Sequence, residues 1–92
     1  MSQATIRIGK STDNDYVIPA DAPGVSRHHA RLVREVDGRL FIEDADSANG
    51  TFVNGDRIVR KRLGASDTVT LGDTYTLDVR EALKFDNDYT AE

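Results

Sequence analysis

The chain has 92 residues, enough for one small domain with a single modest core, and hydrophobic residues make up 38% of it. It contains no cysteine, which excludes a disulfide framework and a thiolate metal site, and its formal net charge of −4 is not that of a general nucleic-acid binder. No leader-like segment or membrane-length apolar run is present, so we expect a cytoplasmic protein with no membrane contact.

The spacing of turn signals, at about eight to twelve residues, is that of an all-β sandwich. In chain order, we expect strands at residues 5–8, 16–18, 30–36, 39–43, 51–53, 57–59, 69–71 and 74–79. Asp37-Gly38 predicts a two-residue hairpin, and Asn54-Gly55-Asp56 predicts another tight turn. In the last strand Tyr75, Leu77 and Val79 alternate with polar residues, as in a half-buried strand.

These strands leave four polar, glycine-containing segments as loops, at residues 9–15, 20–29, 44–50 and 54–56. Several of the loops are expected to meet at one end of the sandwich, and binding residues commonly lie on such loops. Only residues 80–86 could form a turn or two of helix. We therefore predict one β-sandwich domain over residues 1–80 and an acidic tail or linker over residues 81–92.

The run Gly9-Lys10-Ser11 has the ending of a nucleotide-binding P-loop. That motif needs a second glycine where Ala4 stands, and it opens a helix that faces the phosphates. The residues that follow, Asp13-Asn14-Asp15, favour a loop instead. The sequence therefore excludes a P-loop and leaves open a phosphate carried by something other than a nucleotide.

Metal binding and catalysis find no support. His28 and His29 are the two histidines of the chain, and neighbouring residues on a strand point to opposite faces. The loop that begins at Asp44 lacks the glycine and glutamate of a calcium-binding loop. Ser26 and His29 have no third partner of a catalytic triad. We expect no metal, no cofactor and no enzymatic activity.

Three segments are informative together: "IGKSTDND", "VSRHHARL" and "SANGTFVNG". In this order and spacing they resemble the forkhead-associated (FHA) domain, a β-sandwich that recognises phosphothreonine in partner proteins. The resemblance covers about residues 6–79. It implies an antiparallel β-sandwich of the FHA/SMAD type, here a compact version with a short N-terminus.

The resemblance assigns the ligand contacts residue by residue. Lys10 follows the loop glycine and would supply a cation to the phosphate, while Ser26 would donate its hydroxyl. Arg27 would face the peptide or the edge of the phosphate. Asn49 would hold the peptide backbone through its amide, with Ala48 beside it in the peptide-binding segment.

Further residues would shape these loops. In the family the histidine that falls on His29 is mainly architectural and braces the serine loop. Gly9, Gly50, Thr51 and Asn54 would form the turns, and we expect positive φ angles at the two glycines because tight bends often need them.

The chain departs from the family pattern at two contact positions. Lys10 stands where arginine is usual, which replaces a planar fork of donors with one compact charge. Ala48 stands where many members have a threonine that touches the phosphate. Losing one charge-assisted hydrogen bond costs about 1.5–3 kcal/mol.

The short N-terminus is a third departure, because family members usually carry one or two strands before the first segment. A sheet edge that is normally covered could lie open here, which favours a homodimer through that edge.

The predicted function is phosphothreonine-dependent protein binding in signalling or assembly. The alternative, which Lys10 and Ala48 favour, is a phosphate-independent FHA-like assembly domain, as in some bacterial secretion-system components. A basic cluster raises nucleic-acid binding as a third candidate, through Arg57, Arg60, Lys61 and Arg62. No aromatic residue lies within that cluster for base stacking, so we expect a protein partner and no nucleic acid.

Overall fold

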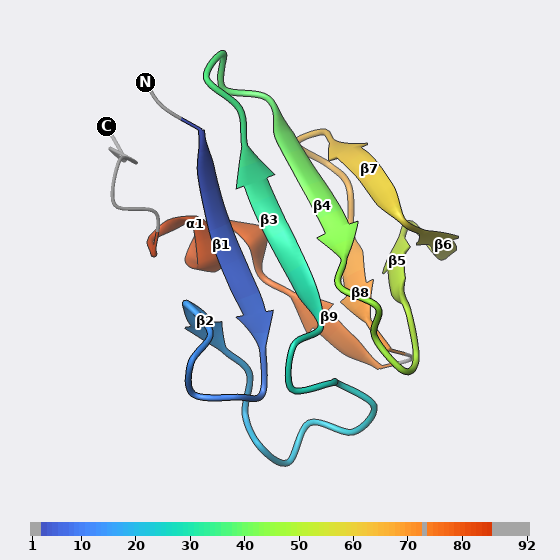
Figure 1. Ribbon diagram of the computed structural model, residues 1–92. Coiled ribbons are helices and arrows are strands. Elements are labelled where there is room, and N and C mark those ends of the chain that lie inside the picture. Colours follow the sequence, from blue (N-terminus) through green and yellow to red (C-terminus); the bar gives the residue numbers. More distant parts are fainter. Residues whose placement is uncertain (1–2, 73, 86–92) are drawn as a thin grey trace.

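The computed structural model describes residues 3–72 and 74–85, which form two β-sheets packed face to face and one short helix (Figure 1). The elements in chain order are β1 (Ala4–Gly9), β2 (Tyr16–Val17), β3 (Ala30–Arg34), β4 (Leu40–Asp44), β5 (Thr51–Val53), β6 (Asp56–Ile58), β7 (Arg60–Leu63), β8 (Val69–Leu71), β9 (Tyr75–Leu77) and α1 (Val79–Leu83).

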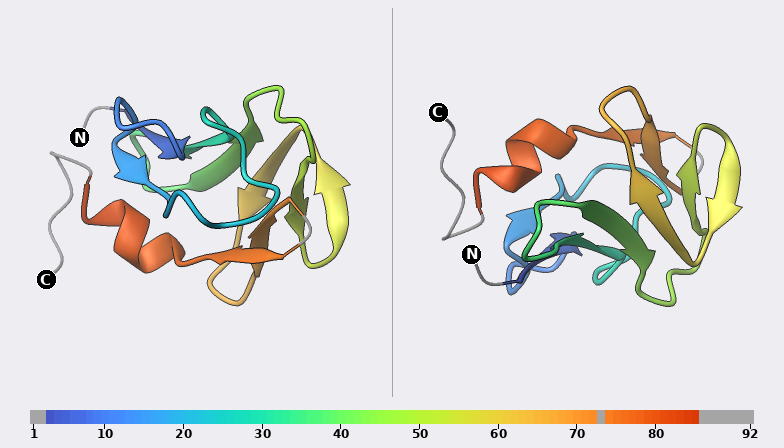
Figure 2. Two further views of the ribbon diagram at one scale, coloured as in Figure 1. Left: turned by 90° about the horizontal axis from the view of Figure 1, so that it is seen from below. Right: turned by 90° about the horizontal axis from the view of Figure 1, so that it is seen from above.

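The sheets have the orders β2-β1-β3-β4-β7 and β6-β5-β8-β9. All paired strands are antiparallel except β1 and β2, which pair in parallel with Ile8 opposite Tyr16. The predicted all-β antiparallel sandwich is therefore confirmed, and Figure 2 shows its two layers along the strands.

The core lies between the sheets and follows from the alternation of side chains along each strand. In the first sheet Ile6, Leu32 and Ile42 stand opposite one another on neighbouring strands, and none is more than 1% exposed. In the second sheet Val69 and Leu71 point inward and are equally buried. Burial of these branched side chains is the main force that holds the layers together.

Strand β7 was not predicted. It pairs with β4, with Leu40 opposite Leu63. Leu63 is the one buried residue of β7, and the other three residues are exposed. Arg60 lies with its guanidinium carbon 3.9 Å from the centre of the Phe41 ring and bonds to Glu43. At this sheet edge, ionic and cation–π contacts replace the hydrophobic alternation by which a strand is recognised in a sequence.

The predicted two-residue hairpin at Asp37-Gly38 was also wrong. Glu35 donates its backbone N–H to Arg39 over 2.8 Å and accepts from the N–H of Gly38 over 2.9 Å. The loop therefore has three residues, 36–38, a length that commonly ends in a glycine with positive φ, as Gly38 does here.

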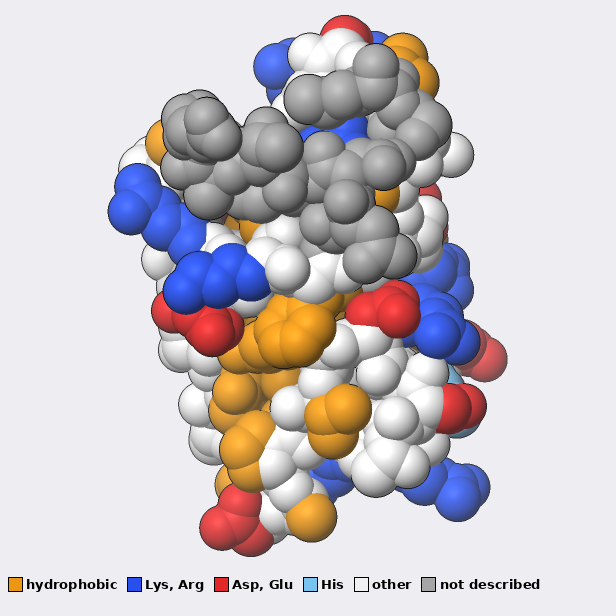
Figure 3. Space-filling view, turned by 90° about the vertical axis from the view of Figure 1, so that its left-hand side faces the viewer, with side chains coloured by type: hydrophobic (Ala, Val, Ile, Leu, Met, Phe, Trp, Pro, Cys, Tyr) orange, Lys and Arg blue, Asp and Glu red, His pale blue; other side chains and the backbone are white. Residues whose placement is uncertain are grey.

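Helix α1 follows β9 and closes one side of the sandwich (Figure 2). Asp78 caps it by accepting from the N–H of Glu81 over 3.1 Å, and Ala82 and Leu83 are buried in the core. Just past the helix, Phe85 meets the Tyr16 ring edge to face, with centroids 5.5 Å apart. Hydrophobic side chains gather on this side of the molecule (Figure 3).

The structure bears on two predictions, the boundary of the domain and the open sheet edge. The predicted boundary after residue 80 falls within α1, and residues 86–92 of the predicted tail lie outside the described residues. Strand β9 stands at the edge of its sheet, and a homodimer through such an edge stays a prediction. Within the part of the chain that the structure describes, no helix has the length and apolar character needed to span a membrane.

If α1 is part of the folded unit, Leu83→Ala should lower the free energy of unfolding by about 2–3 kcal/mol, because it leaves a cavity beneath the helix. The neighbouring Lys84→Ala removes only an exposed pair with Glu81 and should change it by less than about 0.5 kcal/mol. Urea unfolding followed by circular dichroism measures both. Equal effects of the two variants would show that the helix does not contribute to the core.

Candidate functional site

The loops that follow β1, β2 and β4 meet at one end of the sandwich, the lower end in Figure 1. Lys10 donates its backbone N–H to the carbonyl of Ser26 over 3.1 Å. Ala48 donates its N–H to the hydroxyl oxygen of Ser26 over 3.1 Å, and the Asn49 amide donates to the carbonyl of Gly24 over 3.0 Å. The structure thus brings together residues that the sequence analysis assigned to one site.

His29 lies beneath these loops and is fully buried. Its Nδ1 accepts the backbone N–H of Ser26 over 3.0 Å, and its Nε2 lies 2.8 Å from the carbonyl oxygen of Gly50. Its own backbone bonds to the carbonyl of Ile8 and accepts from Ala45, both over 2.9 Å. One side chain therefore joins the serine loop to the loop after β4.

The partners of His29 determine the state of its ring. The N–H of Ser26 is a donor, so Nδ1 must present its lone pair, and the carbonyl of Gly50 accepts, so Nε2 must carry the hydrogen. We assign the neutral ring with hydrogen on Nε2. A buried ring with both nitrogens satisfied in this way positions the loops without being available to a ligand.

The two site glycines have different roles. Gly50 has a φ of 90°, as expected, and its carbonyl accepts from both His29 and the N–H of Gly72. The prediction of a positive φ at Gly9 was wrong. Gly9 is required for space instead, because a Cβ there would lie 2.1 Å from the carbonyl oxygen of Arg27.

Asn14 was missed by the sequence analysis. It is 8% exposed, and its amide donates to the carbonyls of Ser11 over 2.8 Å and Arg27 over 2.7 Å. This bond pair holds the Lys10 loop against the serine loop. The available signal was an asparagine three residues after a serine in a predicted loop, a position from which the side chain can bond to backbone.

Asp44 and Ser47 were also missed. Asp44 accepts from the hydroxyls of Ser47 over 2.6 Å and Thr51 over 2.8 Å, and the Ser47 oxygen accepts the N–H of Gly50 over 2.9 Å. Burial acts to raise the pKa of the Asp44 carboxyl, but the hydrogen bonds from Ser47 and Thr51 outweigh it and lower that pKa. The carboxylate thus fixes the turn on which Asn49 stands.

Asn54 does not join the site. Its side chain donates to Asp67 over 2.9 Å and accepts the N–H of Thr68 over 3.0 Å, in the loop between β7 and β8. These contacts lie at the opposite end of the sandwich from the Ser26 loop (Figure 1). Asn54 shapes a loop, as predicted, but not a loop of the candidate site.

The charges at the site are unequally paired. Asp13 bonds to His28 over 2.9 Å and Asp15 to Arg7 over 3.2 Å. Hydrogen bonds, from Ser11 and His28 to Asp13 and from the backbone and side chain of Arg7 to Asp15, lower the pKa of both carboxyls, so both acids stay ionised and paired. By contrast, the side chains of Lys10 and Arg27 have no carboxylate partner among residues 3–72 and 74–85.

The Ser26 hydroxyl accepts one hydrogen bond and donates none to any residue that the structure describes. The described part of the chain also gathers no cluster of three His, Cys, Asp or Glu side chains that could hold a metal ion. The loop end therefore offers a hydroxyl donor and two cationic side chains, which is a set suited to an anion.

Comparison with known proteins identifies the family. Residues 6–72 match the family model described as the FHA domain. The chain is 49% identical over 67 residues to the ABC transporter ATP-binding/permease protein Rv1747 of Mycobacterium tuberculosis, a match that covers 73% of this chain and 7% of that protein. The chain thus corresponds to a small part of this relative.

Two solved structures show the same fold. One is M. tuberculosis EmbR in complex with a low-affinity phosphopeptide, with a TM-score of 0.68 and 36% identity, covering 79% of this chain and 19% of that one. The other is the FhaA FHA domain complexed with the intracellular domain of Rv3910, with a TM-score of 0.68 and 28% identity, covering 78% and 76%.

The role of the buried imidazole can be tested with adjacent histidines. His29→Ala should lower the free energy of unfolding by about 3 kcal/mol, since it leaves a cavity and an unpaired backbone N–H at Ser26, while the Gly50 carbonyl keeps its bond from Gly72. His28→Ala, which removes an exposed pair with Asp13, should cost less than about 1 kcal/mol. Denaturant titration of both variants decides, and similar losses would contradict the assignment.

The lowered pKa of Asp44 gives a pH dependence. Its ionised form stabilises the fold above the unfolded pKa of about 3.9, and this contribution is lost as the pH falls through the lower folded pKa. Asp44→Asn should therefore be less stable than the wild type at pH 7, and the difference should shrink below about pH 4. Unfolding free energies measured from pH 7 to acid would refute this if the difference stayed constant.

Proposed function

The chain belongs to the FHA domain family, and from that premise we propose that it binds a phosphothreonine in a partner protein, with the phosphate held by Lys10 and Ser26. The observation that carries the proposal is the convergence of these two residues, whose loops are bonded to each other. A dianionic phosphate requires several strong donors at once. The hydroxyl hydrogen of Ser26 and the ammonium of Lys10, neither of which has a partner among the described residues, supply them.

The flanking residues suit the peptide. Asn49 already donates to Gly24 through its amide nitrogen, and its amide oxygen accepts nothing from the described residues, so it remains open to a peptide N–H. Arg27 is exposed, and its carbonyl is anchored by Asn14 and by the N–H of Ser11. In the proposed complex the Arg27 backbone is fixed while its side chain adapts to the phosphate or the peptide.

In the proposed complex, Ala48 contributes through its backbone, by orienting Ser26. Its N–H bonds to the oxygen of Ser26, which leaves the hydroxyl hydrogen as the group that Ser26 presents. The missing side-chain donor at this position reduces the number of phosphate contacts without disturbing the serine. EmbR, a relative of the same fold, has been solved in complex with a phosphopeptide, which supports phosphopeptide binding as the proposed function.

The test is a calorimetric titration with a degenerate phosphothreonine peptide pool and its unphosphorylated counterpart. We expect binding to the phosphorylated pool alone. Ser26→Ala should weaken it about tenfold or more, because a charge-assisted hydrogen bond is lost. Ser66→Ala, an exposed serine outside these loops, serves as the matched control and should bind like the wild type.

Equal affinity of the wild type for both pools, or no binding to either, would overturn the proposal. Equal affinity would favour the alternative of a phosphate-independent assembly domain. Urea midpoints for Ser26→Ala separate a lost contact from a lost fold, because the Ser26 oxygen also anchors Ala48.

A further inference from the structure

Arg57, on β6, lies against the turn that carries Asn49. A Cβ placed on Gly50 would lie 2.8 Å from the Nε of Arg57 and 3.1 Å from its Cζ, so the guanidinium covers Gly50 directly. Arg57 stands opposite Phe52 on β5 and is exposed. It therefore places a positive charge beside the proposed peptide-binding loop.

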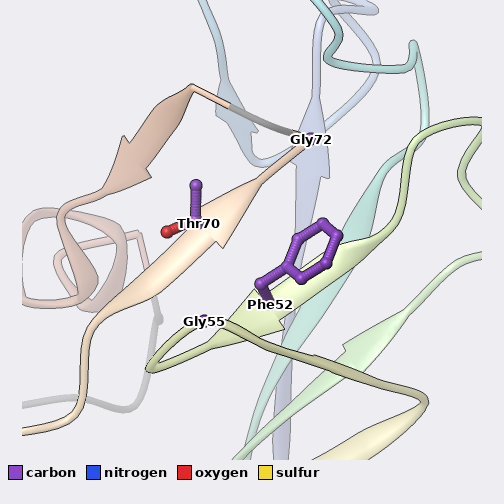
Figure 4. A pocket seen from close by; sticks show the side chains of 4 residues that line it. All are labelled: Phe52, Gly55, Thr70 and Gly72. Carbon is purple, nitrogen blue, oxygen red and sulfur yellow. The ribbon is translucent and has the colours of Figure 1, made fainter.

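A hollow of about 240 Å³ lies on the outer face of the second sheet, lined by Phe52, Gly55, Thr70 and Gly72 (Figure 4). The Phe52 ring and the Thr70 side chain stand on neighbouring strands and border it (Figure 4). Gly72 also donates its N–H to the carbonyl of Gly50 over 2.8 Å, so the hollow begins where the loop site ends.

We propose that a peptide anchored by its phosphothreonine continues over Gly50 and Gly72 into this hollow, and that Arg57 selects an acidic side chain on it. This inference rests on the proposed function. Gly50 follows Ala48 by two residues, so roughly 7 Å of chain at most separates them. Two or three residues of an extended peptide cover such a span.

The charge pattern favours an acidic residue. In the first sheet Arg31 pairs with Glu43, and Arg60 pairs with both Glu43 and Glu35, so their charges are compensated within the protein. Arg57 has no carboxylate partner within the described ranges. A planar guanidinium held over a glycine presents its donors to a carboxylate at low entropic cost.

The experiment uses phosphothreonine peptides in which each flanking position in turn is Glu, Ala or Lys, with affinity measured by fluorescence anisotropy. The wild type should prefer Glu over Ala at one position by roughly two- to fivefold. Arg57→Gln should abolish this preference, so that the Glu and Ala peptides bind with equal affinity. Arg57→Glu should reverse it and favour Lys.

Arg62→Gln is the matched control, because Arg62 is also exposed and lies on β7 in the other sheet. It should keep the wild-type preference. If the wild type binds phosphopeptides without any acidic preference, or if Arg57→Gln retains the preference, this inference is wrong while the proposed function stands. If the wild type binds every peptide equally well with and without the phosphate, both this inference and the proposed function fail.

Discussion

The buried imidazole of His29 is the constraint on which the loop end of this sandwich depends. If its two ring nitrogens were buried without hydrogen-bond partners, the fold would lose several kcal/mol of stability. The loops that supply these partners must therefore hold one arrangement. That arrangement joins Ser26 to Gly50 across the two layers. The position of the serine hydroxyl is thus set from below, by a residue that no ligand can reach.

Around this residue, the site is built largely from backbone groups. Asn14 bonds to two carbonyls, Asp44 holds Ser47 and Thr51, and Ser47 in turn holds the N–H of Gly50. These buried or half-buried polar side chains satisfy loop backbone that would otherwise be unpaired. The consequence is that exposed donors are held in place on these loops, which would lower the entropic cost of binding the proposed anion.

Sequence reasoning recovered what depends on side-chain pattern. Alternation predicted most of the strands, and motif residues such as Ser26 and Asn49 do lie together. It missed β7, whose Arg60 is held by ionic and aromatic contacts that leave no periodic signal. It also missed Asp44, because a carboxylate that bonds to neighbouring hydroxyls is indistinguishable in a sequence from a solvated loop acid.

The two unusual contact residues, Lys10 and Ala48, bear on how the proposed complex would divide its binding energy. In that complex both would reduce phosphate recognition, Lys10 by replacing the planar fork of an arginine with a point charge and Ala48 by providing no side-chain donor. Affinity must then draw more on contacts beyond the phosphate. Arg57 lies over Gly50 and pairs with no carboxylate of residues 3–72 or 74–85, so it is a cation placed to supply such a contact. A weaker anchor combined with a charged flank would shift selectivity from the phosphate alone toward the sequence around it.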